Sequence, residues 1–142
     1  MSKNNIKIRQ LKEGDSNDKL IKLFEQLTSR EVEFDINKVL QVPNLFCYVA
    51  EVDGKIAGFA ALTLRFVPTK GYVGVIEDVV VDENYRRMGL GTKLMEKLLE
   101  KGKELKVFAI ELTSNPQREG ARRLYQKLGF ELLETGVFRL TL

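Results

Sequence analysis

Two arginines and two glycines lie close together in the middle of the chain, between an apolar segment and a helical pattern. Residues 76–81 read Ile-Glu-Asp-Val-Val-Val, Arg86, Arg87, Gly89 and Gly91 follow, and an amphipathic pattern begins directly after them. The first backbone N–H groups of a helix have no partner within the helix, and the helix dipole makes this end positive. Glycines also let a ligand approach the backbone. The spacing therefore predicts a cradle for a phosphate or pyrophosphate.

Two better-known phosphate-binding patterns do not fit this loop. A Walker loop needs Gly-x-x-x-x-Gly-Lys-Ser/Thr, which the chain lacks, and the dinucleotide fingerprint needs a third small residue where this chain has Leu94. An isolated pair of glycines more often only shapes a turn. The loop by itself leaves both interpretations open.

The composition limits the catalytic groups. The chain has no His and one Cys, which excludes a Ser-His-Asp triad, a Cys-His pair, an imidazole base or metal ligand, a thiolate zinc site and an intrachain disulfide. No bound metal is expected. Cys47 lies in the apolar run 45–49, which is typical of a buried, inert thiol. Catalysis must therefore use carboxylates, Tyr, Lys or Arg, backbone dipoles, or a bound cofactor.

The elements that must position these groups can be predicted from hydrophobic periodicity and turn residues. Strands are expected over residues 6–9, 46–52, 56–67, 72–82, 107–112, 130–133 and 137–142, and helices after 14–18, over 35–42, after 89–91 and over 121–128. Residues 53–54, Asp-Gly, predict a tight hairpin turn. Ile36, Val39 and Leu40 are expected to face inward. The order β-α-α-β-β-β-α-β-α-β-β predicts a mixed α/β layered sheet rather than a doubly wound one.

Nothing in the sequence marks a domain boundary, so one domain over residues 1–142 is expected: there are three prolines, no Ser/Gly-rich linker and no internal repeat. The net charge is +3, but residues 86–142 hold 12 basic and 7 acidic side chains, a net of +5. No apolar stretch reaches the roughly 18 residues of a membrane helix. The polar start at residues 1–5 does not read as a signal peptide. A cytoplasmic protein without membrane contact is expected.

The loop and a later segment together resemble the GNAT N-acetyltransferase superfamily. Arg86-x-x-Gly89-x-Gly91, between a strand and a helix, is similar to its acetyl-CoA signature, Arg/Gln-x-x-Gly-x-Gly/Ala. Asn115 followed by residues 121–130, Ala-Arg-Arg-Leu-Tyr-Gln-Lys-Leu-Gly-Phe, resembles its second element, Asn…Ala-x-x-Leu/Phe-Tyr-x-x-x-Gly-Phe. The likeness covers nearly the whole chain in element order, so it favours the cradle over the plain turn.

Within the superfamily, residues 76–81 look most similar to glucosamine-6-phosphate and aminoalkylphosphonate N-acetyltransferases. The resemblance implies the GNAT fold, an α/β (α+β) structure with a single mixed, mostly antiparallel central sheet flanked by helices. Strands 76–81 and 107–113 are expected to splay apart at the acetyl-CoA site, with the pantetheine arm between them. The implied acetyl-CoA contacts are Val79, Val80, Val81, Arg86, Arg87, Met88, Gly89, Leu90, Gly91, Thr92, Asn115 and Tyr125.

The resemblance further implies direct transfer of an acetyl group from acetyl-CoA to a primary amine of a small acceptor. An alkyl amine with a pKa of about 10 is protonated at neutral pH, so a base is needed. Glu77 is expected to serve, directly or through a water. Asp78 points to the opposite face of a regular strand but not of a bulged one, so it stays an alternative base. Tyr125 is expected to protonate the departing thiolate, and the backbone N–H near Val79 to polarise the thioester oxygen.

The acceptor is expected near residues 30–34 and 66–72, where two opposed sets of charged side chains lie. The basic set, suited to an acceptor phosphate or phosphonate, consists of Arg30, Arg65 and Lys70. The acidic set, suited to a polyamine or a basic peptide, consists of Glu31, Glu33 and Asp35. An amino sugar phosphate, an aminophosphonate, a polyamine and an amino acid all stay open as acceptors.

A catalytically silent acetyl-CoA sensor is the alternative function. It would share the cradle but would need neither Glu77 nor Tyr125, so the presence of both favours an enzyme. A nucleic-acid-binding module is disfavoured, because the chain has four Tyr, no Trp and no basic run interleaved with aromatic residues. A homodimer is a further expectation from the resemblance.

Overall fold

Two units make up the chain, one ending at Leu112 and the other running over Thr113–Leu142. The computed structural model describes residues 4–142, so the first three residues of the polar start lie outside the described part. Each unit is described by itself, and the expectation of one domain stays a prediction. Among the described residues, no helix has the length and apolar character needed to cross a membrane; a cytoplasmic location stays a prediction.

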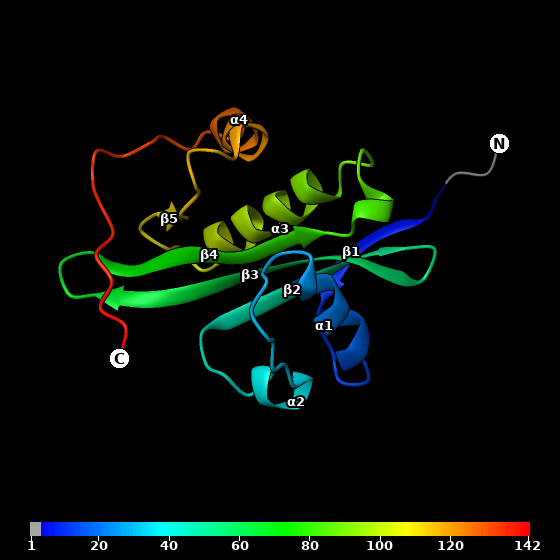
Figure 1. Cartoon of the computed structure of the whole chain (residues 1–142). Helices are drawn as coiled ribbons and strands as arrows, with labels where there is room; N and C mark the ends of the chain where they lie inside the picture. The colour runs from blue at the N-terminus through cyan, green and yellow to red at the C-terminus, as the bar shows by residue number, and fades with distance from the viewer. Residues whose placement is uncertain (1–3) are drawn as a thin grey trace. The chain divides into compact units, whose positions relative to one another are not determined.

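The first unit is built on a five-stranded sheet with the strand order β1-β2-β3-β4-β5 (Figure 1). The strands are β1 (Ile6–Gln10), β2 (Leu45–Val52), β3 (Lys55–Val67), β4 (Gly71–Val81) and β5 (Ile110–Glu111). The first three pairings are antiparallel, and β4 with β5 is parallel. The predicted mixed, mostly antiparallel sheet and the turn between β2 and β3 are confirmed.

Helices cover both faces of this sheet, with α1 and α2 on one side and α3 on the other (Figure 1). Their bounds are α1 (Asn17–Glu25), α2 (Ile36–Val39) and α3 (Leu90–Glu104), and a short 3-10 turn, η1 (Glu83–Tyr85), precedes α3. Ser16 caps α1, because its hydroxyl accepts a hydrogen bond of 3.2 Å from the N–H of Lys19. The predicted capping residues before α1 therefore act as expected.

The second helix is shorter than the sequence predicts. It ends at Val39 rather than at residue 42, and the Leu40 side chain, which was expected to face inward, is 44% exposed. Pro43 disfavours the helical conformation for the residue before it, and Asn44 adopts a left-handed conformation with φ of 60°. These two residues turn the chain into β2, so only Ile36 of the predicted inward set is fully buried.

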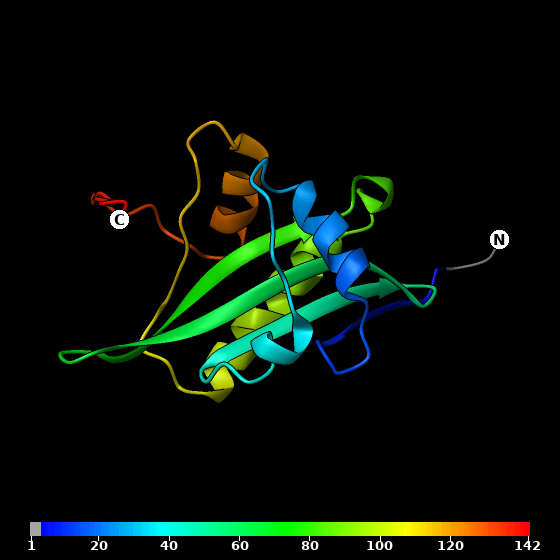
Figure 2. The same cartoon turned by 60° about the horizontal axis from the view of Figure 1, so that its bottom comes forward.

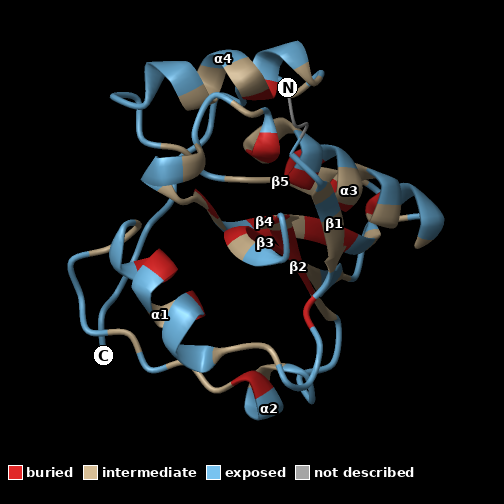
Figure 3. Ribbon diagram, turned by 90° about the vertical axis from the view of Figure 1, so that its right-hand side faces the viewer, coloured by how far each residue is buried: buried red, intermediate tan, exposed pale blue. Residues whose placement is uncertain are grey.

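Buried side chains gather along β2, β3 and β4 (Figure 3). Residues 57–62 of β3 are all buried, as expected for a strand with helices over both faces. Towards α1 the core contains Phe24, Val49 and Phe59, and on the α3 side Leu94 and Leu98 have no exposed surface. This core fixes β4 between β3 and β5, and it holds the start of α3 against the end of β4.

The second unit contains α4 (Glu119–Lys127), which ends as predicted near Gly129, a residue with φ of 99°. The strands predicted over 130–133 and 137–142 are wrong, because the structure has no strand there. A strand requires a neighbour with which to exchange hydrogen bonds, and no residue of the second unit supplies such a ladder. Phe138 is 100% exposed and Leu132 72% exposed. Alternating apolar residues predicted the strands but could not supply their partner.

Candidate active site

A β-bulge interrupts β4 next to the predicted base. Phe59 pairs with Val80 and Ala61 pairs with Glu77, so Ala60 alone lies opposite two residues of β4. Asp78, one of these two, has a left-handed backbone with φ of 53°. Because the bulge adds a residue, the side chains of both Glu77 and Asp78 line the same cavity. The opposite-face arrangement of a regular strand does not occur here.

Glu77 has the altered acidity that a base requires. Burial raises the pKa of its carboxyl group above the ordinary value, and the negative charge of Asp78 raises it further. A higher pKa makes the carboxylate a stronger proton acceptor. Burial first, and then the charge of Asp78, also raises the pKa of the Cys47 thiol to about 11. This thiol stays protonated at neutral pH, and the prediction of a buried Cys47 is confirmed.

The loop after β4 presents a run of free backbone donors. None of the N–H groups of residues 86–92 donates a hydrogen bond within the described residues, and the first bond of α3 runs from Lys93 to the carbonyl of Gly89. Arg87 and Gly89 both have left-handed backbones, with φ of 65° and 74°. These conformations turn the loop into the helix and leave its donors at the positive end of the α3 dipole.

The same loop carries unpaired positive charge. The side chains of Arg86, Arg87 and Lys93 are exposed, and none of them belongs to an ion pair of the described residues. At Gly91 an added Cβ would meet only Val81, at 3.8 Å. Free N–H groups, a helix N-terminus and unpaired cations are the partners that a pyrophosphate needs. The residues present therefore fit the pyrophosphate of a nucleotide cofactor.

One edge of β4 is open beyond its first half. The ladder with β5 has only two residue pairs, which end at Val75. Further along, the N–H of Asp82 donates to Ala57 of β3 at 2.8 Å. Since N–H groups alternate along a strand, the N–H of Val81 points to the other edge, which has no strand partner within the first unit. The Val80 side chain packs in the core. The open edge at Val81 can hold an extended ligand arm.

A cavity of about 730 Å³ lies over the bulge, on the α1 side of the sheet. The segment between α1 and α2, light blue to cyan in Figure 2, runs across this face of the strands and forms one wall. The cavity is lined by Phe24, Leu27, Thr28, Arg30, Glu31, Val32, Glu33, Phe34, Val39, Leu45, Cys47, Phe59, Ala61, Thr63, Glu77 and Asp78. The predicted acceptor segment 30–34 therefore lines the same cavity as the predicted base.

The other predicted acceptor segment does not line this cavity. Phe66 and Tyr72 contact each other, with ring centroids 5.2 Å apart, and both are exposed. Arg65 pairs with Glu111 at 3.0 Å, and the ammonium of Lys70 lies 5.7 Å from the Phe108 ring centroid. Of the aromatic residues that line the cavity, the sequence predicted Phe34 as part of the acceptor segment but missed Phe24 and Phe59. These two have the helix and strand spacing of core residues, and only their place in the cavity reveals the second role.

The second unit contains the two later site residues. The Tyr125 side chain is buried, and its ring packs edge-on against Phe130 with centroids 6.1 Å apart. The Asn115 side-chain oxygen accepts a hydrogen bond of 3.0 Å from the N–H of Gln117. Glu77 belongs to the first unit and Tyr125 to the second, so their action in one site stays a prediction.

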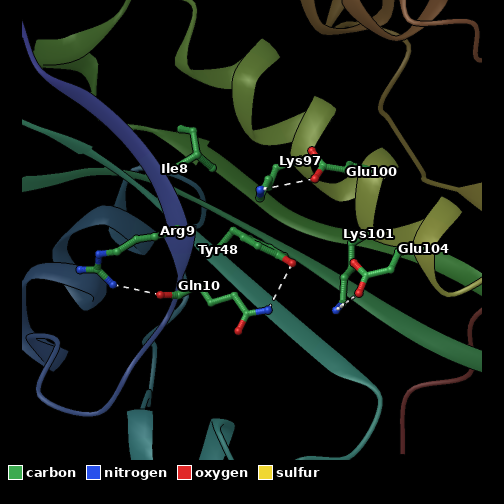
Figure 4. A pocket seen from close by; sticks show the side chains of 8 residues that line it. All are labelled: Ile8, Arg9, Gln10, Tyr48, Lys97, Glu100, Lys101 and Glu104. Atoms are coloured by element: carbon green, nitrogen blue, oxygen red, sulfur yellow. Dashed lines mark hydrogen bonds and ion pairs between the residues drawn. The ribbon is translucent and has the colours of Figure 1, made fainter.

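A smaller hollow of about 370 Å³ lies between β1, β2 and α3 (Figure 4). Its charged side chains already have partners: Lys97 pairs with Glu100 at 3.6 Å and Lys101 with Glu104 at 3.5 Å. The Tyr48 hydroxyl accepts a hydrogen bond of 3.4 Å from Gln10. Arg9, which also lines the hollow, pairs with Asp15 at 2.8 Å and with Glu51 at 2.7 Å. This hollow therefore lacks the unpaired cations that the loop at residues 86–93 presents.

The chain is similar in sequence and in structure to known acetyltransferases. The family model described as the acetyltransferase (GNAT) family matches residues 8–130. A glucosamine 6-phosphate N-acetyltransferase of Arabidopsis thaliana is 31% identical over 135 residues, which cover 87% of this chain and 89% of that protein. The crystal structure of a Trypanosoma brucei acetyltransferase has a TM-score of 0.81 and 29% identity, and covers 97% of this chain and 100% of that chain.

An aminoglycoside N-acetyltransferase in complex with CoA shares the fold, with a TM-score of 0.85 at 22% identity over 99% of this chain and 97% of that chain. The chain spans only 38%, 61% and 55% of the length of three other curated relatives. The family match nevertheless runs from β1 to the residue after Gly129 and includes both the loop at 86–92 and α4. The chain belongs to the acetyltransferase (GNAT) family.

Proposed function

We propose that this chain is an N-acetyltransferase that moves an acetyl group from acetyl-CoA directly to a primary amine of a small acceptor. The observation that carries the proposal is the run of free N–H groups over residues 86–92, placed directly after a bulged strand with Glu77 in a cavity. Acyl transfer to an amine needs an anchored acyl donor and a proton acceptor. The first unit has groups suited to both tasks.

The loop would hold the pyrophosphate of acetyl-CoA through its backbone donors, and Arg86, Arg87 and Lys93 would add charge. The open edge of β4 at Val81 would hydrogen-bond to the pantetheine arm in the manner of a strand. When bound, acetyl-CoA supplies the activated acetyl group. A backbone N–H at the bulge, near Val79, would stabilise negative charge on the thioester oxygen. A relative in fold holds CoA, which agrees with this assignment.

Glu77 would remove the proton that keeps the acceptor amine unreactive. An alkyl ammonium has a pKa of about 10, and a carboxylate with a raised pKa, within a cavity large enough for a small amine, is suited to accept its proton directly or through a water. The departing CoA thiolate requires a proton in return, and Tyr125 is assigned to that step. A sensor that only binds acetyl-CoA would need neither Glu77 nor Tyr125.

A thermal unfolding experiment tests the cradle. Acetyl-CoA at 100 times its Kd should stabilise the protein by about 2.7 kcal/mol. Pantetheine, which lacks the pyrophosphate, should give a smaller shift in Tm at the same concentration. If acetyl-CoA at saturating concentration does not shift the Tm, the chain is neither an acetyl-CoA-dependent enzyme nor an acetyl-CoA sensor.

Release of free thiol in the presence of amines then separates the two functions. An acetyltransferase releases one CoA thiol for each amine acetylated, whereas a sensor binds acetyl-CoA and releases none. A Tm shift with no thiol release across a panel of sugar, aliphatic and amino acid amines would favour the sensor.

A further inference from the structure

The acceptor cavity has an uneven charge, and this identifies the class of amine. Four acidic residues and a single arginine line it. Two of the carboxylates, Glu31 and Glu33, come from the segment between α1 and α2, and the other two, Glu77 and Asp78, come from the bulge of β4. Acidic residues from two separate segments of the chain therefore line one cavity.

The basic side chains that could have balanced this charge are engaged elsewhere. Arg65 is held by Glu111 at 3.0 Å, and Lys70 lies over the Phe108 ring at 5.7 Å from its centroid. Neither of them lines the cavity. Arg30 alone remains, and its guanidinium Nε donates to the uncharged Thr28 hydroxyl at 3.5 Å. An acceptor phosphate would meet one cation and four anions.

Apolar side chains line the same cavity as the two acidic pairs. Phe24 and Phe59 meet edge to face with centroids 4.9 Å apart, and Phe34 packs against Phe24 at 5.1 Å. Leu27 and Leu45 also line the cavity. A chain of methylene groups buries its surface well on such side chains, whereas sugar hydroxyls would lose hydrogen bonds to water there. A cavity lined by apolar side chains and by two pairs of acidic residues from separate segments matches an aliphatic chain with a cation at each end.

We propose that the acceptor is an aliphatic diamine or polyamine, with the reacting amine at Glu77 and Asp78, a second ammonium group at Glu31 and Glu33, and the methylene chain along the phenylalanine side chains. This inference rests on the proposed acetyl transfer and narrows its acceptor. The proposed acceptor differs from glucosamine 6-phosphate, the acceptor in the name of the Arabidopsis relative. Like-charge repulsion between Glu77 and Asp78 would fall when an ammonium group binds between them.

The test uses the full-length protein, acetyl-CoA and a free-thiol assay. 1,4-Diaminobutane and n-butylamine have the same methylene chain and differ in one ammonium group, so their kcat/KM ratio isolates the second cation. We expect the diamine to be preferred by about tenfold or more, the effect of two charge pairs in a partly solvated site. Glucosamine 6-phosphate should react more slowly than the diamine.

Variants then locate the second ammonium group. Glu31→Gln together with Glu33→Gln should raise KM for 1,4-diaminobutane by about tenfold and change the n-butylamine reaction by less than about threefold. Glu13→Gln is the matched control, because Glu13 is exposed and does not line the cavity. It should leave both reactions unchanged.

Two results would overturn the inference while leaving acetyl transfer intact: faster acetylation of glucosamine 6-phosphate than of the diamine, or equal kcat/KM for the diamine and n-butylamine. A preference for the diamine that survives the double substitution would likewise remove Glu31 and Glu33 as the second cation site. No shift in Tm with acetyl-CoA and no thiol release with any amine would overturn the proposed function and this inference together.

Discussion

Gly89 and Gly91 lie two residues apart at the start of α3, and replacing each with alanine should change stability in opposite directions. Gly89 has φ of 74° and an added Cβ there would meet nothing within 4 Å, so the cost of Gly89→Ala is backbone strain alone. A left-handed conformation costs a non-glycine residue about 1 kcal/mol. At Gly91, which has no positive φ, the added Cβ would only touch Val81 at 3.8 Å.

Gly91→Ala should therefore stabilise the protein by about 0.5 kcal/mol, because alanine suits a helix and restricts the unfolded chain. The expected difference between the two variants is about 1.5 kcal/mol in the free energy of unfolding, measured by urea denaturation with unchanged m-values.

Acetyl-CoA binding should also differ between the two variants. The loss of one hydrogen bond to a charged group costs about 1.5–3 kcal/mol. In Gly89→Ala the backbone would leave its left-handed conformation and turn N–H groups of the loop away from the pyrophosphate. The Kd for acetyl-CoA should therefore rise about tenfold or more.

In Gly91→Ala the Kd for acetyl-CoA should stay within about threefold of the unsubstituted protein, since the backbone keeps its course. Isothermal titration calorimetry measures both constants under one set of conditions. Equal changes in stability and in Kd for the two variants would refute the reasoning, because they would mean that the left-handed conformation at Gly89 does not aim the donors.

Three further predictions concern the side chains of Glu77, Asp78 and Tyr125. Glu77→Gln should lower kcat/KM by about 100-fold or more with an unchanged Kd for acetyl-CoA, and full activity would remove Glu77 as the base. Asp78→Asn removes a charge that raises the pKa of Glu77; the base then ionises at lower pH, so the acidic limb of the kcat/KM profile should move to lower pH, and an unmoved limb would contradict the coupling. Tyr125→Phe should reduce kcat without weakening acetyl-CoA binding, as measured by steady-state kinetics and calorimetry, and unchanged turnover would remove Tyr125 from the mechanism.

Local patterns predicted the parts of the fold that depend on neighbours in sequence. Alternation and the Asp-Gly turn specified β2 and β3, and the capping residues specified the start of α1. Leu40 was expected inside but is 44% exposed, because Pro43 and Asn44 end the helix early. The final two strands were not formed, since pairing partners are not encoded in the alternating pattern itself.

The sequence likewise predicted some features of the site and not others. The resemblance of the loop and the later segment to the GNAT superfamily, rather than the glycine spacing alone, predicted the phosphate cradle, and the resemblance also raised the possibility of a bulge at Glu77 and Asp78. The sequence could not show that Arg65 and Lys70 are engaged elsewhere, because their partners, Glu111 and Phe108, are distant along the chain. The proposal of a diamine or polyamine acceptor uses those contacts, because they leave Arg30 as the one basic residue among those that line the cavity.

Acetyl transfer itself is tested most directly by counting products in one reaction. The purified protein, acetyl-CoA and a panel of amines that includes 1,4-diaminobutane and glucosamine 6-phosphate should give at least one acetylated amine, identified by mass spectrometry, with one free CoA thiol for each molecule formed. Omission of the amine should stop thiol release. Binding of acetyl-CoA without acetylated product, or thiol release that does not depend on an amine, would contradict the account.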